Sequence, residues 1–211
     1  MKVKEIPENT LHRLVIYLKV LEDLEKKRIE SISSEELARR CGVNSAQLRK
    51  DLTFVGHLGT KGVGYNVRSL KYSLKNFLGR SQEWNLVLGG LSPLGIFLLE
   101  NKELQKEGFY FMAAFDHREE NIAKIYNGVS VYSLDQISYV FKAIKVDIGV
   151  ITAEENPEIY LEAFLNQGLK AILNLSKAPL FVKDTSVKIE NFSFPLALTK
   201  LSYFLKDSDK G

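Results

Sequence analysis

The spacing of hydrophobic residues changes near residue 80 of the chain. Between Thr10 and Glu25 the apolar residues recur in steps of three and four, which is typical of one face of an amphipathic helix. They are Leu11, Leu14, Val15, Leu18, Leu21 and Leu24. Beyond Arg80, short apolar runs alternate with stretches of helical spacing. The pattern predicts a small helical domain followed by an α/β domain.

Two short helices with a tight turn between them are predicted next. Ser33 and Glu36 have the spacing of a capping box, which marks the start of a helix. Gly42 lies in the following turn, and Asn44 or Ser45 can cap the second helix, which is expected at residues 46–56. Two short helices joined by a glycine-containing turn, the second with adjacent cations on its surface, are typical of a helix-turn-helix.

A glycine-rich segment follows the helix-turn-helix. Residues 56–64 contain four glycines, so the segment is unsuited to a helix interior or a central strand. We expect a tight hairpin with Lys61 at its tip and Tyr65 at its exit, which would be the wing of a winged helix. Asn66 can then cap a fourth helix that runs to Leu78–Gly79.

Charge is distributed unevenly between the two predicted domains. Residues 1–80 carry 16 Lys and Arg against 9 Asp and Glu, whereas residues 81–211 carry 13 against 17, and the whole chain has a net charge of +3. A basic module attached to an acidic one favours a polyanion as the partner of the first. Together with the helix-turn-helix and the glycine hairpin, this charge predicts that residues 1–80 bind duplex DNA.

The candidate DNA contacts lie on the second short helix and in the hairpin. Arg49 is expected to read a guanine edge, which is worth about 1–3 kcal/mol of discrimination, whereas Lys50 and Lys61 are expected to contact phosphate. Gln47 and Thr53 can add polar contacts to base edges. The alternative is a small helical domain with a basic surface, in which Arg49 pairs with a neighbouring acid.

The second predicted domain alternates strands and helices. Strands are expected at residues 85–88, 109–115, 129–132, 147–152, 171–175 and 187–192. Helices are expected at residues 96–104, 137–144 and 157–167, and a last, apolar helix at residues 195–205. Connections this short imply a parallel sheet with right-handed crossovers, which is a Rossmann-like α/β fold.

A glycine turn after the first of these strands is the candidate nucleotide site. It consists of Gly90, Leu91, Ser92, Pro93, Leu94 and Gly95, and it begins a helix whose N-terminal amides suit a pyrophosphate. Asp116, at the end of the second strand, lies where an acid binds ribose hydroxyls. However, Ser92 replaces the usual second glycine, and Pro93 lacks an amide donor. The motif alone leaves open both a working site and a vestigial turn.

Several function classes find no support in the residues. Cys41 is the only cysteine, which excludes an internal disulfide and a cysteine-based zinc site. His12, His57 and His117 lie apart, and neither a metal-ligand spacing nor a catalytic constellation occurs, so we expect no metal and no enzyme. The first residues lack the apolar core of a signal peptide, and no apolar stretch approaches about 18 residues, which predicts a soluble cytoplasmic protein without membrane contact.

Several motifs together are similar to those of one protein family. The most specific is Arg49-Lys50-Asp51-Leu52-Thr53-Phe54, followed by Gly56, Gly59 and Gly62-Val63-Gly64-Tyr65. Ile32-Ser33-Ser34 with Glu36-Leu37-Ala38, and Ala113-Ala114-Phe115-Asp116, agree as well. Over nearly its whole length the chain resembles Rex, a bacterial family of redox-sensing transcriptional repressors that joins a winged helix to a Rossmann domain.

The resemblance implies a homodimer that binds palindromic operators and is released when NADH replaces NAD+ in the Rossmann pocket. It implies a DNA-binding domain over residues 1–80, a dinucleotide domain over residues 81–194 and a dimerisation helix, swapped between subunits, over residues 195–211. The DNA contacts would include Gly62 and Tyr65. The dimer contacts would be Leu198, Leu201, Tyr203 and Phe204. The alternative for these four apolar residues is an intramolecular core.

The chain departs from the family pattern mainly in the ligand half. In the wing, Thr60-Lys61 stands where the family commonly has a Lys-Arg pair, so the planar fork of arginine is lost. Ser92 and Ala123 each replace a glycine. Arg118 stands where a second acid is usual, and Glu154 replaces a proline close to the crevice.

These departures bear on the cofactor, which the resemblance implies to be NAD(H). Arg118 beside Asp116 can favour a phosphorylated ligand or merely neutralise the acid, whereas Glu154 and Glu155 would repel a pyrophosphate. We expect NAD(H) to bind more weakly than in the family and to couple less strongly to DNA release. Two alternatives stay open: a DNA-binding regulator whose Rossmann domain is only a dimerisation scaffold, and an NAD-dependent oxidoreductase with an accessory domain.

Overall fold

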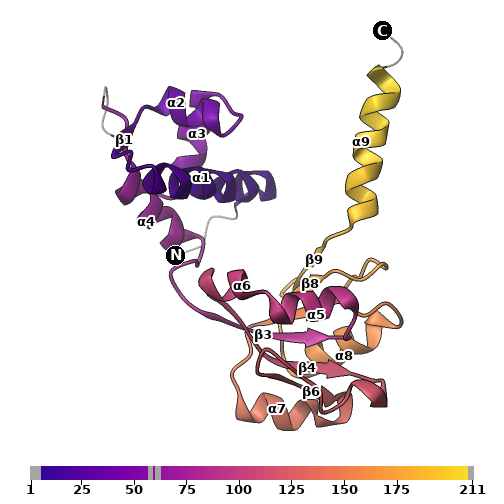
Figure 1. Cartoon of the computed structure of the whole chain (residues 1–211). Helices are drawn as coiled ribbons and strands as arrows, with labels where there is room; N and C mark the ends of the chain where they lie inside the picture. The colour runs from indigo at the N-terminus through magenta and orange to yellow at the C-terminus, as the bar shows by residue number, and fades with distance from the viewer. Residues whose placement is uncertain (1–5, 57–58, 60–62, 209–211) are drawn as a thin grey trace. The chain divides into compact units, whose positions relative to one another are not determined.

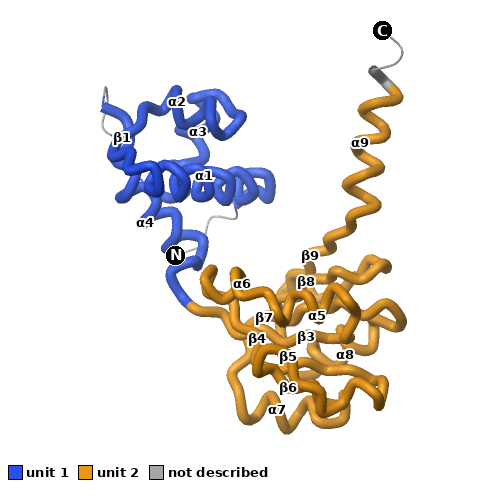
Figure 2. Tube along the Cα trace, in the orientation of Figure 1, with its two compact units in different colours: residues 1–82 blue, residues 83–211 orange. Residues whose placement is uncertain are grey.

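The computed structural model describes residues 6–56, 59 and 63–208, with side chains up to Lys206. The chain folds into two units, Met1–Gln82 and Glu83–Gly211 (Figure 2). Each unit buries its own hydrophobic residues, one cluster in the first unit and two in the second. The two folded bodies are called unit 1 and unit 2.

Unit 1 has the predicted winged helix-turn-helix arrangement (Figure 1). Its elements are α1 (Glu8–Lys26), β1 (Ser31–Ile32), α2 (Ser34–Arg40), α3 (Ser45–Leu52), β2 (Tyr65–Asn66) and α4 (Val67–Phe77). The apolar stripe of α1 lies in the core, where Leu14, Leu21 and Leu24 are completely buried. Strands β1 and β2 pair antiparallel at the base of the wing. Lys61 and Gly62 lie outside the described residues.

The helix starts of unit 1 follow the predicted caps. The Ser33 hydroxyl accepts a hydrogen bond from the Glu36 amide at 3.1 Å, and the Asn44 side chain accepts one from the Gln47 amide at 2.8 Å. Only half of the predicted capping box forms, because the Glu36 carboxylate bonds to Arg39 and Arg40 of the next turn instead. Each cap satisfies one of the amides that a helix start leaves without an intrahelical partner.

Unit 2 has the predicted Rossmann-like sheet. Its strands are β3 (Trp84–Gly89), β4 (Phe109–Asp116), β5 (Ile125–Tyr126), β6 (Val129–Ser133), β7 (Ile148–Ile151), β8 (Ala171–Asn174) and β9 (Lys188–Asn191). Its helices are α5 (Pro93–Glu100), α6 (Lys102–Lys106), α7 (Ile137–Ala143), α8 (Pro157–Asn166) and α9 (Phe194–Ser208), with short 3₁₀ turns at Glu119–Asn121 and Leu134–Gln136. The strand order is β5-β6-β4-β3-β7-β8-β9, and every pair except β5–β6 is parallel.

Helices cover both faces of the sheet, so the ends of the strands are the part of the sheet that a ligand can reach. Val87 of β3 packs in one cluster with residues of α7 and α8, whereas its neighbours Leu86 and Leu88 pack in the other cluster with Leu99 of α5. This alternation is the period-two pattern of a strand that is buried on both faces. The strand order reverses between β3 and β7, and open α/β sheets bind ligands at the carboxyl ends of such neighbouring strands.

Three local features differ from the sequence prediction. The helix expected at residues 96–104 is broken at Asn101, whose side chain accepts from the Glu103 amide and starts α6. Helix α3 ends at Leu52, earlier than expected, and residues 53–55 form a turn. Strands β1 and β5 were not predicted, because two residues are too few to produce an alternating pattern.

Candidate functional site

Helix α3 is fixed to α1 by a buried acid, Asp51. The Asp51 carboxylate accepts from Arg13 Nε at 2.6 Å and Arg13 Nη2 at 2.8 Å, from the Tyr17 hydroxyl at 2.8 Å, and from Gln47 Nε2 at 2.8 Å. The side chain of Asp51 is only 1% exposed. A buried carboxylate is tolerated only when it is paired and hydrogen-bonded, so this cluster determines how α3 sits on α1.

The same contacts shift the pKa of Asp51 and of its partners. Burial raises the pKa of Asp51, but the hydrogen bonds from Arg13, Tyr17 and Gln47 outweigh burial, and the net pKa lies below its usual value. The hydrogen bond to Asp51 raises the pKa of Arg13. Burial, followed by the bond to Asp51, raises the pKa of Tyr17. The acid therefore stays charged, and both partners stay protonated, at neutral pH.

The predicted DNA contacts on α3 differ in how available they are. Arg49 is 53% exposed and makes a loose ion pair with Glu35 at 3.6 Å, besides a hydrogen bond to the Ser34 hydroxyl at 3.2 Å. Lys50 is exposed as well. One N–H of the Gln47 side-chain amide is already bonded to Asp51, which restricts the orientations in which Gln47 can contact a base.

Two further DNA candidates have contacts within unit 1. The Thr53 hydroxyl is exposed and donates to the backbone carbonyl of Lys50 at 2.6 Å. Tyr65 does not match the expectation of a surface contact, because its ring is only 7% exposed and belongs to the core of unit 1. A Cβ at Gly59 would come within 2.8 Å of that ring, so Tyr65 supports the base of the wing.

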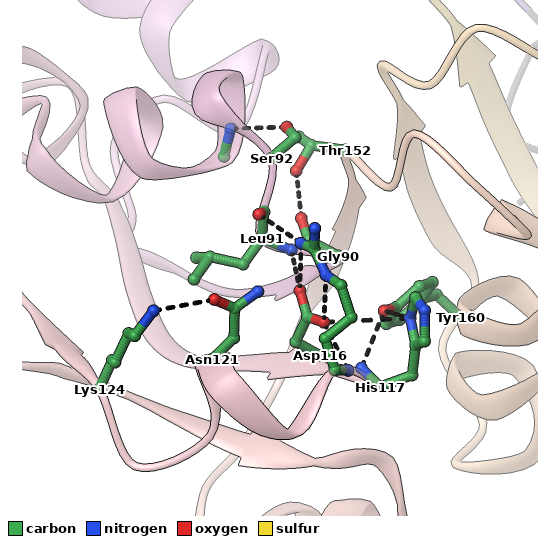
Figure 3. Close-up of polar contacts among 11 residues, drawn as sticks. Gly90, Leu91, Ser92, Asp116, His117, Asn121, Lys124, Thr152 and Tyr160 are labelled. Carbon is green, nitrogen blue, oxygen red and sulfur yellow. Dashed lines mark hydrogen bonds and ion pairs between the residues drawn. The ribbon is translucent and has the colours of Figure 1, made fainter.

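The glycine turn of unit 2 brings the ends of β3 and β7 into close contact. Gly90 has a φ of +81°, and a Cβ on it would lie 2.4 Å from the Cβ of Ala153. The Thr152 hydroxyl donates to the Gly90 carbonyl at 2.5 Å (Figure 3). A Cβ at Gly95 would lie 2.5 Å from the Thr152 hydroxyl oxygen, so glycine is required at both ends of the turn.

Asp116, the predicted ribose acceptor, is completely buried and fully engaged. Its Oδ2 accepts from the Leu91 amide at 2.6 Å and from Arg118 Nη2 at 3.0 Å (Figure 3). Its Oδ1 accepts from the Arg118 amide at 2.8 Å and from Arg118 Nε at 3.0 Å. Burial raises the pKa of Asp116, but the hydrogen bonds lower it by more, so the net pKa is about 2. The carboxylate therefore holds the turn together, and its acceptor positions are taken by the chain itself.

The amides of the turn are largely satisfied by the chain itself. The Ser92 hydroxyl accepts from the Gly95 amide at 3.1 Å, and the Ser92 amide donates to the Gly90 carbonyl at 3.1 Å. Pro93 has no amide hydrogen, and the Leu94 amide has no partner in the part of the chain that the structure describes. The Ser92 side chain thus caps the start of α5, which is the kind of position where helix amides bind anions.

A pocket of about 190 Å³ opens beside the turn. It is lined by Gly90, Asp116, His117, Arg118, Ala153, Glu154, Glu155 and Tyr160. The Tyr160 hydroxyl accepts from the His117 amide at 3.2 Å and lies 2.7 Å from His117 Nδ1. Burial raises the pKa of Tyr160 to about 12. Glu154 and Glu155 are exposed and line this pocket just after β7, where Glu154 was expected to lie close to the crevice.

The apolar residues of α9 are on the surface of unit 2. Leu198, Leu201, Tyr203 and Phe204 are each more than half exposed in the single chain. Figure 2 shows α9 extending away from the rest of unit 2. The alternative of an intramolecular core therefore does not apply to the single chain. The four side chains form an apolar surface of the kind that marks a protein interface.

Sequence reasoning missed the contacts between distant residues. The Asp51–Arg13 pair joins positions 38 residues apart, and Tyr160 lies 43 residues beyond His117. A usable signal for the first was present, because Thr10, Arg13 and Tyr17 place polar atoms along one face of an apolar helix. Among the described residues, no group of three or more His, Cys, Asp or Glu is arranged to hold a metal ion.

A basic winged helix joined to a Rossmann unit with a pocket at its switch point defines a DNA-binding regulator that responds to a ligand. Residues 5–53 match a family described as putative DNA-binding protein N-terminus. The redox-sensing transcriptional repressor Rex of Syntrophobacter fumaroxidans is 37% identical over 97% of this chain and 98% of its own length. That of Desulforamulus reducens is 39% identical over 94% and 99%. The chain belongs to the Rex family of redox-sensing transcriptional repressors.

Solved structures agree with this membership. The structure of RSP in complex with β-NAD+ and operator DNA superposes with a TM-score of 0.91 at 28% identity, and covers 98% of this chain and 95% of RSP. The structure of RSP in complex with β-NADH superposes with a TM-score of 0.85 at the same identity. RSP is described as a Rex-family repressor. No helix in the described residues is long and apolar enough to cross a membrane.

Proposed function

We propose that this chain is a transcriptional repressor that binds operator DNA as a homodimer and changes its DNA affinity with the NADH/NAD+ ratio. The observation that carries the proposal is the full-length likeness to RSP bound to β-NAD+ and operator DNA. The chain is a regulator and not an enzyme, because the relatives that match it along almost its whole length are named repressors. Its Rossmann unit serves as a nucleotide sensor.

Helix α3 of unit 1 is the proposed DNA reader. Arg49 and Lys50 are exposed cations on this helix, and the Asp51 cluster holds the helix against α1. The exposed Arg49–Glu35 pair is worth about 0–1 kcal/mol, so exchanging it for a guanine edge costs little. Lys50 and the wing residue Lys61 would contact phosphate and provide affinity without sequence preference.

The pocket of unit 2 is the proposed NAD(H) site. Gly90 lets the turn pass close against Ala153 beside the pocket, and the Leu94 amide at the start of α5 has no partner among the described residues. The nicotinamide ring would supply the redox-dependent charge that the protein senses. The residues fit a dinucleotide in backbone shape, but Ser92 and Asp116 already satisfy two of the amides of the turn. We therefore propose that NAD(H) binds more weakly here than in the family.

The exposed apolar face of α9 is the proposed dimer contact. A palindromic operator has two-fold symmetry, and a homodimer presents two copies of α3 with the same symmetry. We propose the cytoplasm as the location, since that is where a bacterial operator is found. A chain ending at Phe194 should be monomeric in light scattering, whereas the full chain should be dimeric. An unchanged mass would show that α9 is not the contact.

The function is tested by DNA binding with and without NADH. A palindromic duplex would first be selected from random sequences with the full chain, and its affinity then measured at one fixed salt concentration, because salt strongly alters protein–DNA affinity. We expect NADH to weaken the binding at least about tenfold, within the usual range of allosteric coupling. Binding that NADH leaves unchanged, at NADH concentrations shown by calorimetry to saturate the protein, would contradict the proposal.

The role of Arg49 is tested by the substitution Arg49→Ala. We expect a loss of about 1–3 kcal/mol on the selected duplex and much less on random DNA, because a base contact carries the specificity. Lys106→Ala removes the same charge from an exposed residue of unit 2 and serves as the matched control. Equal losses for the two variants would show that Arg49 contributes only net charge.

A further inference from the structure

We propose that Arg118 makes the unit 2 pocket accept a phosphate on the adenosine ribose, so that NADPH binds with an affinity close to that of NADH. The inference rests on the proposed function, since it requires a dinucleotide in this pocket. It concerns the selectivity of the site, which departs from a site that uses an acid to select an unphosphorylated ribose.

Asp116 cannot select against a ribose phosphate in this pocket. Selection for NAD(H) depends on a carboxylate that accepts from the ribose hydroxyls and repels a phosphate. Asp116 is 0% exposed, and its two oxygens already accept four hydrogen bonds, from the Leu91 amide and from three donors of Arg118. Its acceptors are therefore not available to a ligand, and the adjacent guanidinium reduces its repulsion of a phosphate.

Arg118 is held in place by the chain, and one side of its guanidinium faces the pocket. Its Nε donates to Asp116, and its Nη2 donates to Asp116 and to the Leu91 carbonyl at 2.7 Å. Within the described residues Nη1 makes no hydrogen bond, and the side chain is 43% exposed where it lines the pocket. A guanidinium fixed by three bonds offers two pre-positioned donors to a phosphate, and such charge-assisted bonds are about twice as strong as neutral ones.

The acidic side chains near Arg118 repel a bound phosphate only weakly. Glu154 and Glu155 line the same pocket, and Glu120 lies close enough to Arg118 to raise the pKa of its guanidinium, after the larger effect of Asp116. All three acids are exposed, so water and salt screen them. Glu154 and Glu155 would repel the pyrophosphate, which NADH and NADPH share, as well as the ribose phosphate, so most of their effect falls on both affinities and only a screened part on the ratio.

The test measures the affinities of the full chain for NADH and NADPH by calorimetry in one buffer. We expect the NADPH dissociation constant to lie within about fivefold of the NADH value, because a charge-assisted contact with Arg118 Nη1 offsets the extra charge of the phosphate. A preference for NADH of about tenfold or more, corresponding to one lost contact of about 1.4 kcal/mol, would overturn the inference.

The variant Arg118→Gln assigns the effect to this side chain. Gln can still donate to Asp116, and we expect it to raise the ratio of the NADPH to the NADH dissociation constant about tenfold. Using the ratio cancels any general weakening of the pocket in the variant. Glu154→Gln is the control, and it should strengthen both ligands while leaving the ratio within about twofold. A ratio that Arg118→Gln leaves unchanged would overturn the role of Arg118.

The outcomes separate this inference from the proposed function. If NADH binds and releases the operator while NADPH does not bind, the redox-sensing function stands and the inference fails. If neither dinucleotide binds, the pocket is not a dinucleotide site, and both fail. If both bind with similar affinity and Arg118→Gln selectively loses NADPH, both are supported.

Discussion

The substitution Asp51→Asn should destabilise unit 1 strongly. It removes the charge that accepts two hydrogen bonds from Arg13 and leaves that guanidinium only 24% exposed and without its counter-ion. Breaking a buried pair costs about 3–5 kcal/mol. Because Arg13 is partly exposed to water and Asn can still accept a hydrogen bond from Tyr17, we expect the free energy of unfolding to fall by about 2–3 kcal/mol. For a unit of 82 residues this corresponds to a melting point lower by about 10–20 °C.

The assay has to report on unit 1 alone. The single tryptophan, Trp84, lies in unit 2, so its fluorescence follows the other unit. Hydrogen exchange measured on peptides from α1 and α3 of the full chain gives the opening free energy of unit 1 directly. Asp23→Asn is the matched control, because it removes the same charge from an exposed pair with Lys27 and should have a much smaller effect on stability. A loss below about 1 kcal/mol for Asp51→Asn, or one equal to the control, would refute the reasoning.

Three further outcomes follow from unit 2. The pKa of Asp116 lies near 2 in the folded chain, below its usual value, so this group stabilises the unit above about pH 4 and loses that effect as the pH falls toward 2. We expect this group to contribute about 1–2 kcal/mol to the free energy of unfolding, because the exposed side of Arg118 is screened by water. In urea unfolding followed by Trp84 fluorescence, the loss of stability on acidification should be smaller in Arg118→Gln than in the wild type. Ala123 has a φ of +63°, so Ala123→Gly should stabilise the unit by about 0.5–1 kcal/mol in the same measurement, and a loss of stability would contradict this. Gly90→Ala would bring two carbons to 2.4 Å and should cost more than about 2 kcal/mol; a wild-type unfolding curve would exclude the close approach.

The fold was largely predictable because its signals are periodic and local. Helical spacing in α1, glycine at the wing and at the β3 turn, and apolar runs for the long strands each appear in a short window of sequence. The break at Asn101 shows the limit. Its flanks are both helical in composition, and only the capping bond from the Glu103 amide shows that the chain leaves one helix and starts another.

The sites were less predictable, because their chemistry depends on contacts between distant residues. Asp116 was placed at the correct strand end, yet the spacing could not show that the Leu91 amide and Arg118 would use all of its acceptors. Ser92 was recognised as a departure that takes up room. Its hydroxyl also caps α5 through the Gly95 amide, so it substitutes for a ligand contact as well as crowding one.

The two ends of the dinucleotide pocket have separate consequences for sensing. NAD+ and NADH share the adenosine end, so the internal bonds of Ser92 and Asp116 would weaken the binding of both forms alike and leave the ratio of their affinities unchanged. A ligand regulates only through a difference in affinity between states. Because a dinucleotide spans the crevice from β4 to the strands beyond β7, the nicotinamide would lie near a second pocket, lined by Leu94, Leu175, Ser176, Lys177, Phe192, Ser193, Phe194 and Pro195. Its apolar walls favour the neutral ring of NADH over the charged ring of NAD+. That pocket includes the first residues of α9, so the oxidation state of the nicotinamide would be sensed beside the proposed dimer contact. Weak overall affinity for the dinucleotide is therefore compatible with a full redox response.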